Sequence, residues 1–147
     1  VLKHLIPDAD VPVVQLSVNA AKPVEYHLEL GRRLAALRDE GVLVLGSGNV
    51  VHNLRAVDWS RPEGGFDWAD RFDAAARAIM TSDPSAIGEL QGHRDNRRAV
   101  PTADHFLPLA YVAGAAGDSL ADGSGSVTVV DDGRAMGSLS MTGYLYS

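Results

Sequence analysis

Two of the five histidines occupy positions where an imidazole could do chemistry. His52 follows the apolar run 42–45 and the Gly-Ser-Gly turn 46–48, a pattern that predicts a buried strand ending in a tight turn. Because ligand sites of open α/β sheets lie at the carboxyl ends of strands, His52 is a candidate acid/base group or metal ligand. His105 stands in the segment 101–105, just before a predicted helix, and its spacing alone does not decide between a functional and a structural role.

The remaining histidines and the glycine turn have more ordinary interpretations. His4 and His93 lie in polar surroundings without site-like spacing, and His27 by itself reads as a helix residue facing a polar neighbour. The glycine turn could cradle a phosphate, which makes a nucleotide-binding α/β protein one alternative. That signal is weak, because the turn lacks both the third glycine of a dinucleotide site and a Gly-Lys-Ser/Thr sequence.

Composition limits the classes of partner and metal. The chain has 147 residues, a net charge of −6 and no cysteine, which fits one domain without disulfides or thiolate sites. We therefore expect nitrogen and oxygen ligands for any metal, no nucleic-acid partner and no membrane partner. There is no signal-peptide pattern, so the cytoplasm is the expected location. The first residue is Val1 and the sequence there already looks internal, so we expect a piece of a longer protein.

The apolar pattern predicts an α/β chain with these elements. A strand at 11–18, a helix opened by Lys22-Pro23 and stopped by Gly41, and a strand at 42–45 form a βαβ unit, which predicts parallel strands. Helices follow at 66–80, at 84–90 after an Asp83 cap, and from Leu107 to the glycines at 114 and 117, while 91–100 is polar and expected to be exposed. Segments 127–130 and 138–146 form a β-hairpin, the second alternating between an apolar and a polar face.

Long stretches of the sequence resemble one family. The similar stretches are 22–27, 30–31, 34–42, 46–55, 101–109 and 136–141. They resemble the 4,5-DOPA dioxygenase extradiol-like proteins, which belong to the class III extradiol ring-cleaving dioxygenases. The likeness spans nearly the whole chain and is weakest between residues 60 and 99.

The resemblance implies a fold and a reaction. The fold would be three-layer α/β, with a central mixed, mostly parallel sheet flanked by helices and a C-terminal β-hairpin. The reaction would be extradiol cleavage of a DOPA-like catechol by O2 at a non-haem metal, Fe(II) or alternatively Zn(II). His52 and His105 would line the metal, and His52 would also be an acid/base candidate. His27 would be the second catalytic residue, and it and Tyr26 would hydrogen-bond the substrate or a ligand.

The resemblance also implies that part of the site is absent from the chain. Family members are considerably longer, and their N-terminal half supplies further metal histidines. Residues 1–147 would then be the C-terminal portion of one domain, with the N-terminal half as partner and little activity alone; the oligomeric state stays open. A non-catalytic, metal-binding relative of the same fold is the second alternative.

Overall fold

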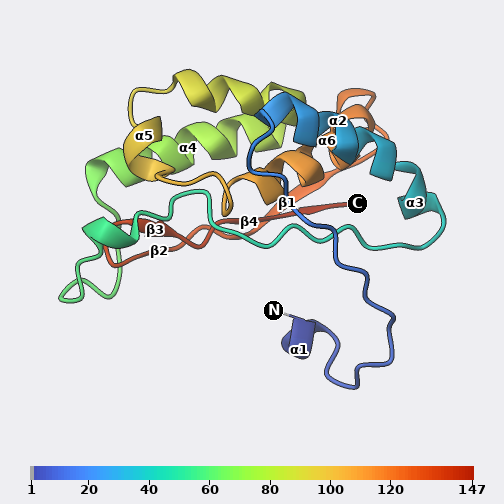
Figure 1. The fold of residues 1–147 in the computed structure, drawn as a ribbon, viewed down its shortest axis with the longest axis horizontal. Helices are drawn as coiled ribbons and strands as arrows, with labels where there is room; N and C mark the ends of the chain where they lie inside the picture. Colours follow the sequence, from blue (N-terminus) through green and yellow to red (C-terminus); the bar gives the residue numbers. More distant parts are fainter. Residues whose placement is uncertain (1) are drawn as a thin grey trace.

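The computed structural model describes residues 2–147, in which the longer helices lie over two small antiparallel sheets and a short N-terminal helix lies apart from them (Figure 1). The helices are α1 (Leu2–Leu5), α2 (Val24–Leu34), α3 (Ala36–Asp39), α4 (Asp67–Ser82), α5 (Asn96–Ala99) and α6 (Leu107–Ala121), with 3-10 segments η1 (Leu54–Ala56) and η2 (Pro84–Gly92). The strands are β1 (Val127–Asp131), β2 (Arg134–Ala135), β3 (Leu139–Ser140) and β4 (Gly143–Tyr146). Over this range, no helix has the length and apolar character that a bilayer crossing requires.

Helices α2 and α6 form the closest pair, and glycines make the approach possible. A Cβ at Gly31 would collide with the Tyr111 carbonyl, and one at Gly114 would collide with the Leu28 carbonyl. The prediction that Gly114 and Gly117 end the last helix is wrong, since α6 continues to Ala121. Both glycines are buried within the helix, and at Gly114 the absence of a side chain lets the backbones of α2 and α6 pack closely.

Helix α4 and η2 supply much of the apolar core. Phe72, Met80 and Ile87 are fully buried, and the predicted helix at 66–80 is confirmed as α4 with slightly later bounds. The Asp83 cap is also confirmed, because its carboxylate accepts the Ser85 backbone N–H at 3.1 Å. Segment 91–100 is less exposed than predicted.

Two other helix predictions need correction. The single helix predicted up to Gly41 is interrupted at Ala35 and continues as α3. Gly41 does end it, with a φ of 81° that favours glycine. Segment 91–100 was predicted to be polar and exposed. It contains the short helix α5, whose last residue, Ala99, is fully buried.

The predicted C-terminal hairpin is present, but its polar face is the buried one. β1 pairs with β4 in antiparallel register, Val127 opposite Tyr146, and β2 pairs with β3 inside the connection. Ser138 and Ser140 are buried, whereas Met141 and Leu145 are exposed. The hydroxyls are buried because each bonds to a neighbouring segment, so burial here follows hydrogen bonding and not hydropathy.

The parallel sheet expected from the βαβ pattern does not occur within residues 2–147. Both sheets are antiparallel pairs, and segments 11–18 and 42–45 are extended chain outside any strand. A strand exists only when another strand satisfies its backbone N–H and C=O groups. The apolar runs correctly marked extended chain, but neither run finds a neighbour in the part of the chain described. The α/β class therefore stands, and the three-layer parallel sheet is not observed.

Candidate functional site

The segment that carries His52 is clamped between β3 and the end of α5. The Ser140 N–H donates to the Val51 carbonyl at 3.0 Å, and the Val51 N–H donates to the Ser140 hydroxyl at 3.1 Å. On the other side, the His52 N–H donates to the Ala99 carbonyl at 3.0 Å. Backbone bonds on both sides fix the direction in which the His52 side chain leaves the chain, a precondition for a site on an otherwise irregular segment.

Both ring nitrogens of His52 lie against backbone carbonyls. Nδ1 is 2.9 Å from the Asn49 oxygen and Nε2 is 2.8 Å from the Thr102 oxygen, and the side chain is only 5% exposed. A neutral imidazole has one N–H, so the tautomer of the ring decides which of the two carbonyls accepts a hydrogen bond from it. In this arrangement both ring nitrogens of His52 face carbonyl oxygens of the chain itself.

His105 lies beside His52, although the two residues are far apart in the sequence. Their ring centroids are 5.1 Å apart and the ring planes are inclined at 43°. The His105 side chain is 50% exposed, and its Nε2 lies 3.6 Å from an Asp104 carboxylate oxygen. An accessible imidazole is therefore presented next to a buried one.

Asp104 and Thr102 connect the two imidazoles and were not singled out by the sequence. The Thr102 carbonyl accepts from His52. The Thr102 hydroxyl bonds to Asp104 and, with smaller effects from the charges of His105 and His52, lowers the pKa of that carboxyl. The only signal in the sequence was that Thr102 and Asp104 lie within three residues of His105. Such proximity matches no known motif.

The glycine-containing segment 46–48 before His52 lies against the turn that holds His105. A Cβ at Gly48 would collide with the His105 carbonyl, and one at Gly46 would lie 2.7 Å from the Pro108 carbonyl oxygen. The two segments can approach closely because neither glycine has a side chain. The tight turn predicted at 46–48 is not observed, since residues 42–49 form no turn and neither Gly46 nor Gly48 has a positive φ.

His27, the other predicted catalytic residue, lies in a separate network. It is fully buried, with Nδ1 3.0 Å from the Tyr111 hydroxyl and Nε2 3.1 Å from the Asn19 carbonyl. The ring thereby ties the end of the segment 11–18 to α6. His93 packs edge-on against Phe72, with centroids 5.3 Å apart. The structure thus brings together His52 and His105, and gives His27 contacts typical of a structural residue.

The donor set for a metal is incomplete in this chain. Within residues 2–147, no group of three or more His, Cys, Asp or Glu side chains could hold an ion. His105 offers an accessible imidazole with an adjacent carboxylate, while the His52 nitrogens are engaged by carbonyls. The geometry offers one accessible imidazole beside a buried one, and any bound ion would need further ligands from elsewhere.

Comparison with known proteins identifies the family. A sequence model described as the catalytic LigB subunit of aromatic ring-opening dioxygenase matches residues 2–139. The chain belongs to this LigB family. The 4,5-DOPA dioxygenase extradiol of Escherichia coli (strain K12) is 43% identical over 96% of the chain and 52% of its own length. That of Beta vulgaris is 35% identical over 80% of the chain and 44% of its own length.

A solved structure has a similar fold. The crystal structure of the uncharacterized protein JW3007 from Escherichia coli K12 matches with a TM-score of 0.87 and 42% identity. The match covers 99% of this chain but 59% of that one. The chain thus spans about half the length of the curated relatives it matches.

Proposed function

We propose that this protein is the portion of an extradiol ring-cleaving dioxygenase that contributes His52 and His105 to the reaction site. The supporting observation is the pair of imidazoles, with centroids 5.1 Å apart, in a chain of the LigB family. The substrates in this proposal are O2 and a catechol of the DOPA type, since similar proteins carry the name 4,5-DOPA dioxygenase extradiol.

The two histidines have different roles in this proposal. His105 binds the metal, Fe(II) in the catalytic form and Zn(II) as the alternative, because its ring is accessible. His52 is the acid/base group of the pair, and its Nε2 would exchange the Thr102 carbonyl, 2.8 Å away, for the catechol. Its assignment as a second metal ligand stays a prediction. Iron held with open coordination positions supplies the activation of O2. His27 is a residue that supports α6, and its assignment as catalytic stays a prediction.

The remaining metal ligands come from outside this chain in the proposal. The described residues lack a third ligand, and the relatives are about twice as long as the region matched. Residues 1–147 are then the C-terminal portion of one domain, and the chain alone is inactive.

The nucleotide-binding alternative has less support. A phosphate loop delivers its ligand to a helix N-terminus, where free N–H groups and the helix dipole attract the anion. Here the glycine-containing segment 46–48 leads to η1, which is three residues long. The non-catalytic alternative differs from the dioxygenase only in turnover, so metal content and activity must both be measured.

The test uses the chain together with the rest of the family domain. We expect His52→Ala to retain the metal and to lose ring opening by about 10²–10⁴-fold, the usual contribution of a general acid/base group. His105→Ala should lose the metal as well. Appearance of the yellow semialdehyde reports turnover, elemental analysis reports metal, and His4→Ala, a change at an exposed histidine, is the control. Normal turnover in His52→Ala would refute the assignment, and stoichiometric metal without turnover in the parent would favour the non-catalytic alternative.

A further inference from the structure

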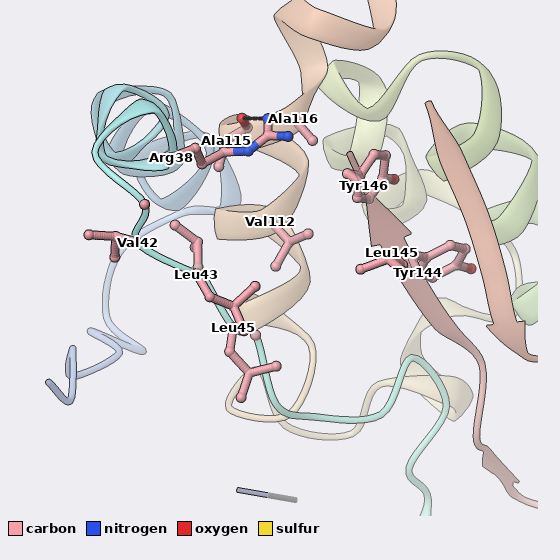
Figure 2. A pocket seen from close by; sticks show the side chains of 13 residues that line it. Arg38, Val42, Leu43, Leu45, Val112, Ala115, Ala116, Tyr144, Leu145 and Tyr146 are labelled. Atoms are coloured by element: carbon pink, nitrogen blue, oxygen red, sulfur yellow. Dashed lines mark hydrogen bonds between the residues drawn. The ribbon is translucent and has the colours of Figure 1, made fainter. Parts of the chain in front are cut away.

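A groove crosses α6 between two extended segments of the chain. Figure 2 shows Leu43 and Leu45 on one side, Leu145 of β4 on the other, and Val112 of α6 between them. The groove has a volume of about 390 Å³. The floor of the groove is a helix and its two walls are extended backbone. A strand inside a helix-covered sheet has the same environment, with a helix on its face and a strand at each edge.

Both walls of the groove present unpaired strand edges. Among the described residues, the backbone groups of 43–48 form no backbone–backbone hydrogen bond, and β4 pairs only with β1, on its other side. The side chains are apolar and accessible, with Leu43 69%, Leu45 45% and Leu145 54% exposed. Exposed apolar edges of this kind attract a further strand.

The groove leads toward the imidazole pair. A second hollow of about 410 Å³ adjoins it and shares Gly46, Val112 and Tyr144 with it. His105 lines this second hollow. A segment lying along both would pass from the end of α3 to the side of His105, where the set of metal ligands is incomplete.

We propose that the groove between 42–46 and β4 receives an extended strand from the part of the LigB-family domain that this chain does not match. That part makes up the remaining length of the solved relative, of which this chain covers 59% while fitting it at a TM-score of 0.87. The strand joins the two edges through backbone hydrogen bonds, covers Leu43 and Leu45, and ends beside His105. The inference rests on family membership and on the groove, and not on the activity proposed above.

The test uses the absence of cysteine in the chain. Leu43→Cys places a single thiol in the groove, and Trp59→Cys places one at another exposed residue that does not line it. Each variant is labelled with a maleimide, alone and after co-expression with the unmatched part of the Escherichia coli relative as a separate polypeptide. We expect a 1:1 complex in which labelling of Leu43→Cys slows at least tenfold while labelling of Trp59→Cys does not change.

Three results would overturn the proposal. The first is unchanged labelling of Leu43→Cys in a 1:1 complex. The second is slow labelling in the isolated chain with a doubled mass by analytical ultracentrifugation, which would assign the groove to a second copy. The third, independent of co-expression, is slow hydrogen exchange at the amides of 43–48 in the monomeric chain, since these amides would then already be paired. None of these measurements involves turnover, so failure here is distinguishable from failure of the dioxygenase assignment.

Discussion

Gly48→Ala tests whether the close approach of the segment before His52 to the turn that holds His105 contributes to the stability of the fold. The added methyl would collide with the His105 carbonyl, a backbone atom that cannot rotate away as a side chain could. Overpacking costs about 1–3 kcal/mol, and the smaller unfolded-state entropy of alanine returns about 0.4–1 kcal/mol. We expect a net loss of about 1–2 kcal/mol in the free energy of unfolding, which for a chain of this size lowers Tm by roughly 2–8 °C.

The matched control for this change is Gly92→Ala. No atom lies within 4 Å of a Cβ placed at Gly92, so the entropy effect acts alone and stability should stay equal or rise slightly. Unfolding in urea followed by circular dichroism measures both variants, and ring-proton NMR shifts of His52 and His105 report whether the imidazoles separate. Equal stability of Gly48→Ala and the parent, with unchanged ring shifts, would refute the close approach of the two segments.

Two further predictions concern charged groups. Asp73→Ala should lower the free energy of unfolding by about 3 kcal/mol, because it removes the buried partner of Arg134 Nη2 at 2.8 Å, leaving Asp70, 3.3 Å from Nε, as the remaining carboxylate, and also removes the acceptor of the buried Thr142 hydroxyl. Urea unfolding checks this, and a loss below about 1 kcal/mol would contradict it. Acidification should destabilise the fold below about pH 4. Hydrogen-bond donors lower the pKa of four aspartates below the ordinary value, and the donors are the side chains of Ser60, Arg71, Thr102 and Ser124. The four aspartates are Asp58, Asp95, Asp104 and Asp122. Their lower pKa in the folded state adds stability above pH 3.8 that disappears as pH falls through the folded values. Burial raises the pKa of Asp73 and opposes the trend; urea midpoints that are constant from pH 5 to pH 2 would contradict the balance.

Local chemistry in the sequence predicted most of the helical elements. The apolar stripe of α4, the Asp83 cap and the Gly41 stop depend on neighbours within a few residues, so they were readable without a structure. The polar face of the last strand was predicted as a pattern, but its burial was not. Hydroxyl partners from distant segments decided that burial, as in the bond from Thr142 to Asp73 at 2.9 Å.

The expected parallel sheet shows where pattern reading ended. The runs 11–18 and 42–45 have the composition of buried strands, yet they are extended and exposed in the described chain. The apolar composition of a segment indicates that it is adapted to burial. It does not indicate which part of a polypeptide covers the segment. The apolar walls of the groove over α6 are therefore consistent with a partner strand supplied from outside these residues.

The sequence by itself determined the family and the candidate histidines, because these depend on residue identity and short spacing, whereas the tight turn predicted at 46–48 is extended chain in the structure. Only the tertiary structure decided that His52 and His105 lie side by side, that two carbonyls occupy the His52 ring, and that His27 is bound to Tyr111. Those relations join residues distant along the chain, and no local rule specifies them. These relations follow from how α6, β3 and the glycine-containing segment 46–48 pack against one another.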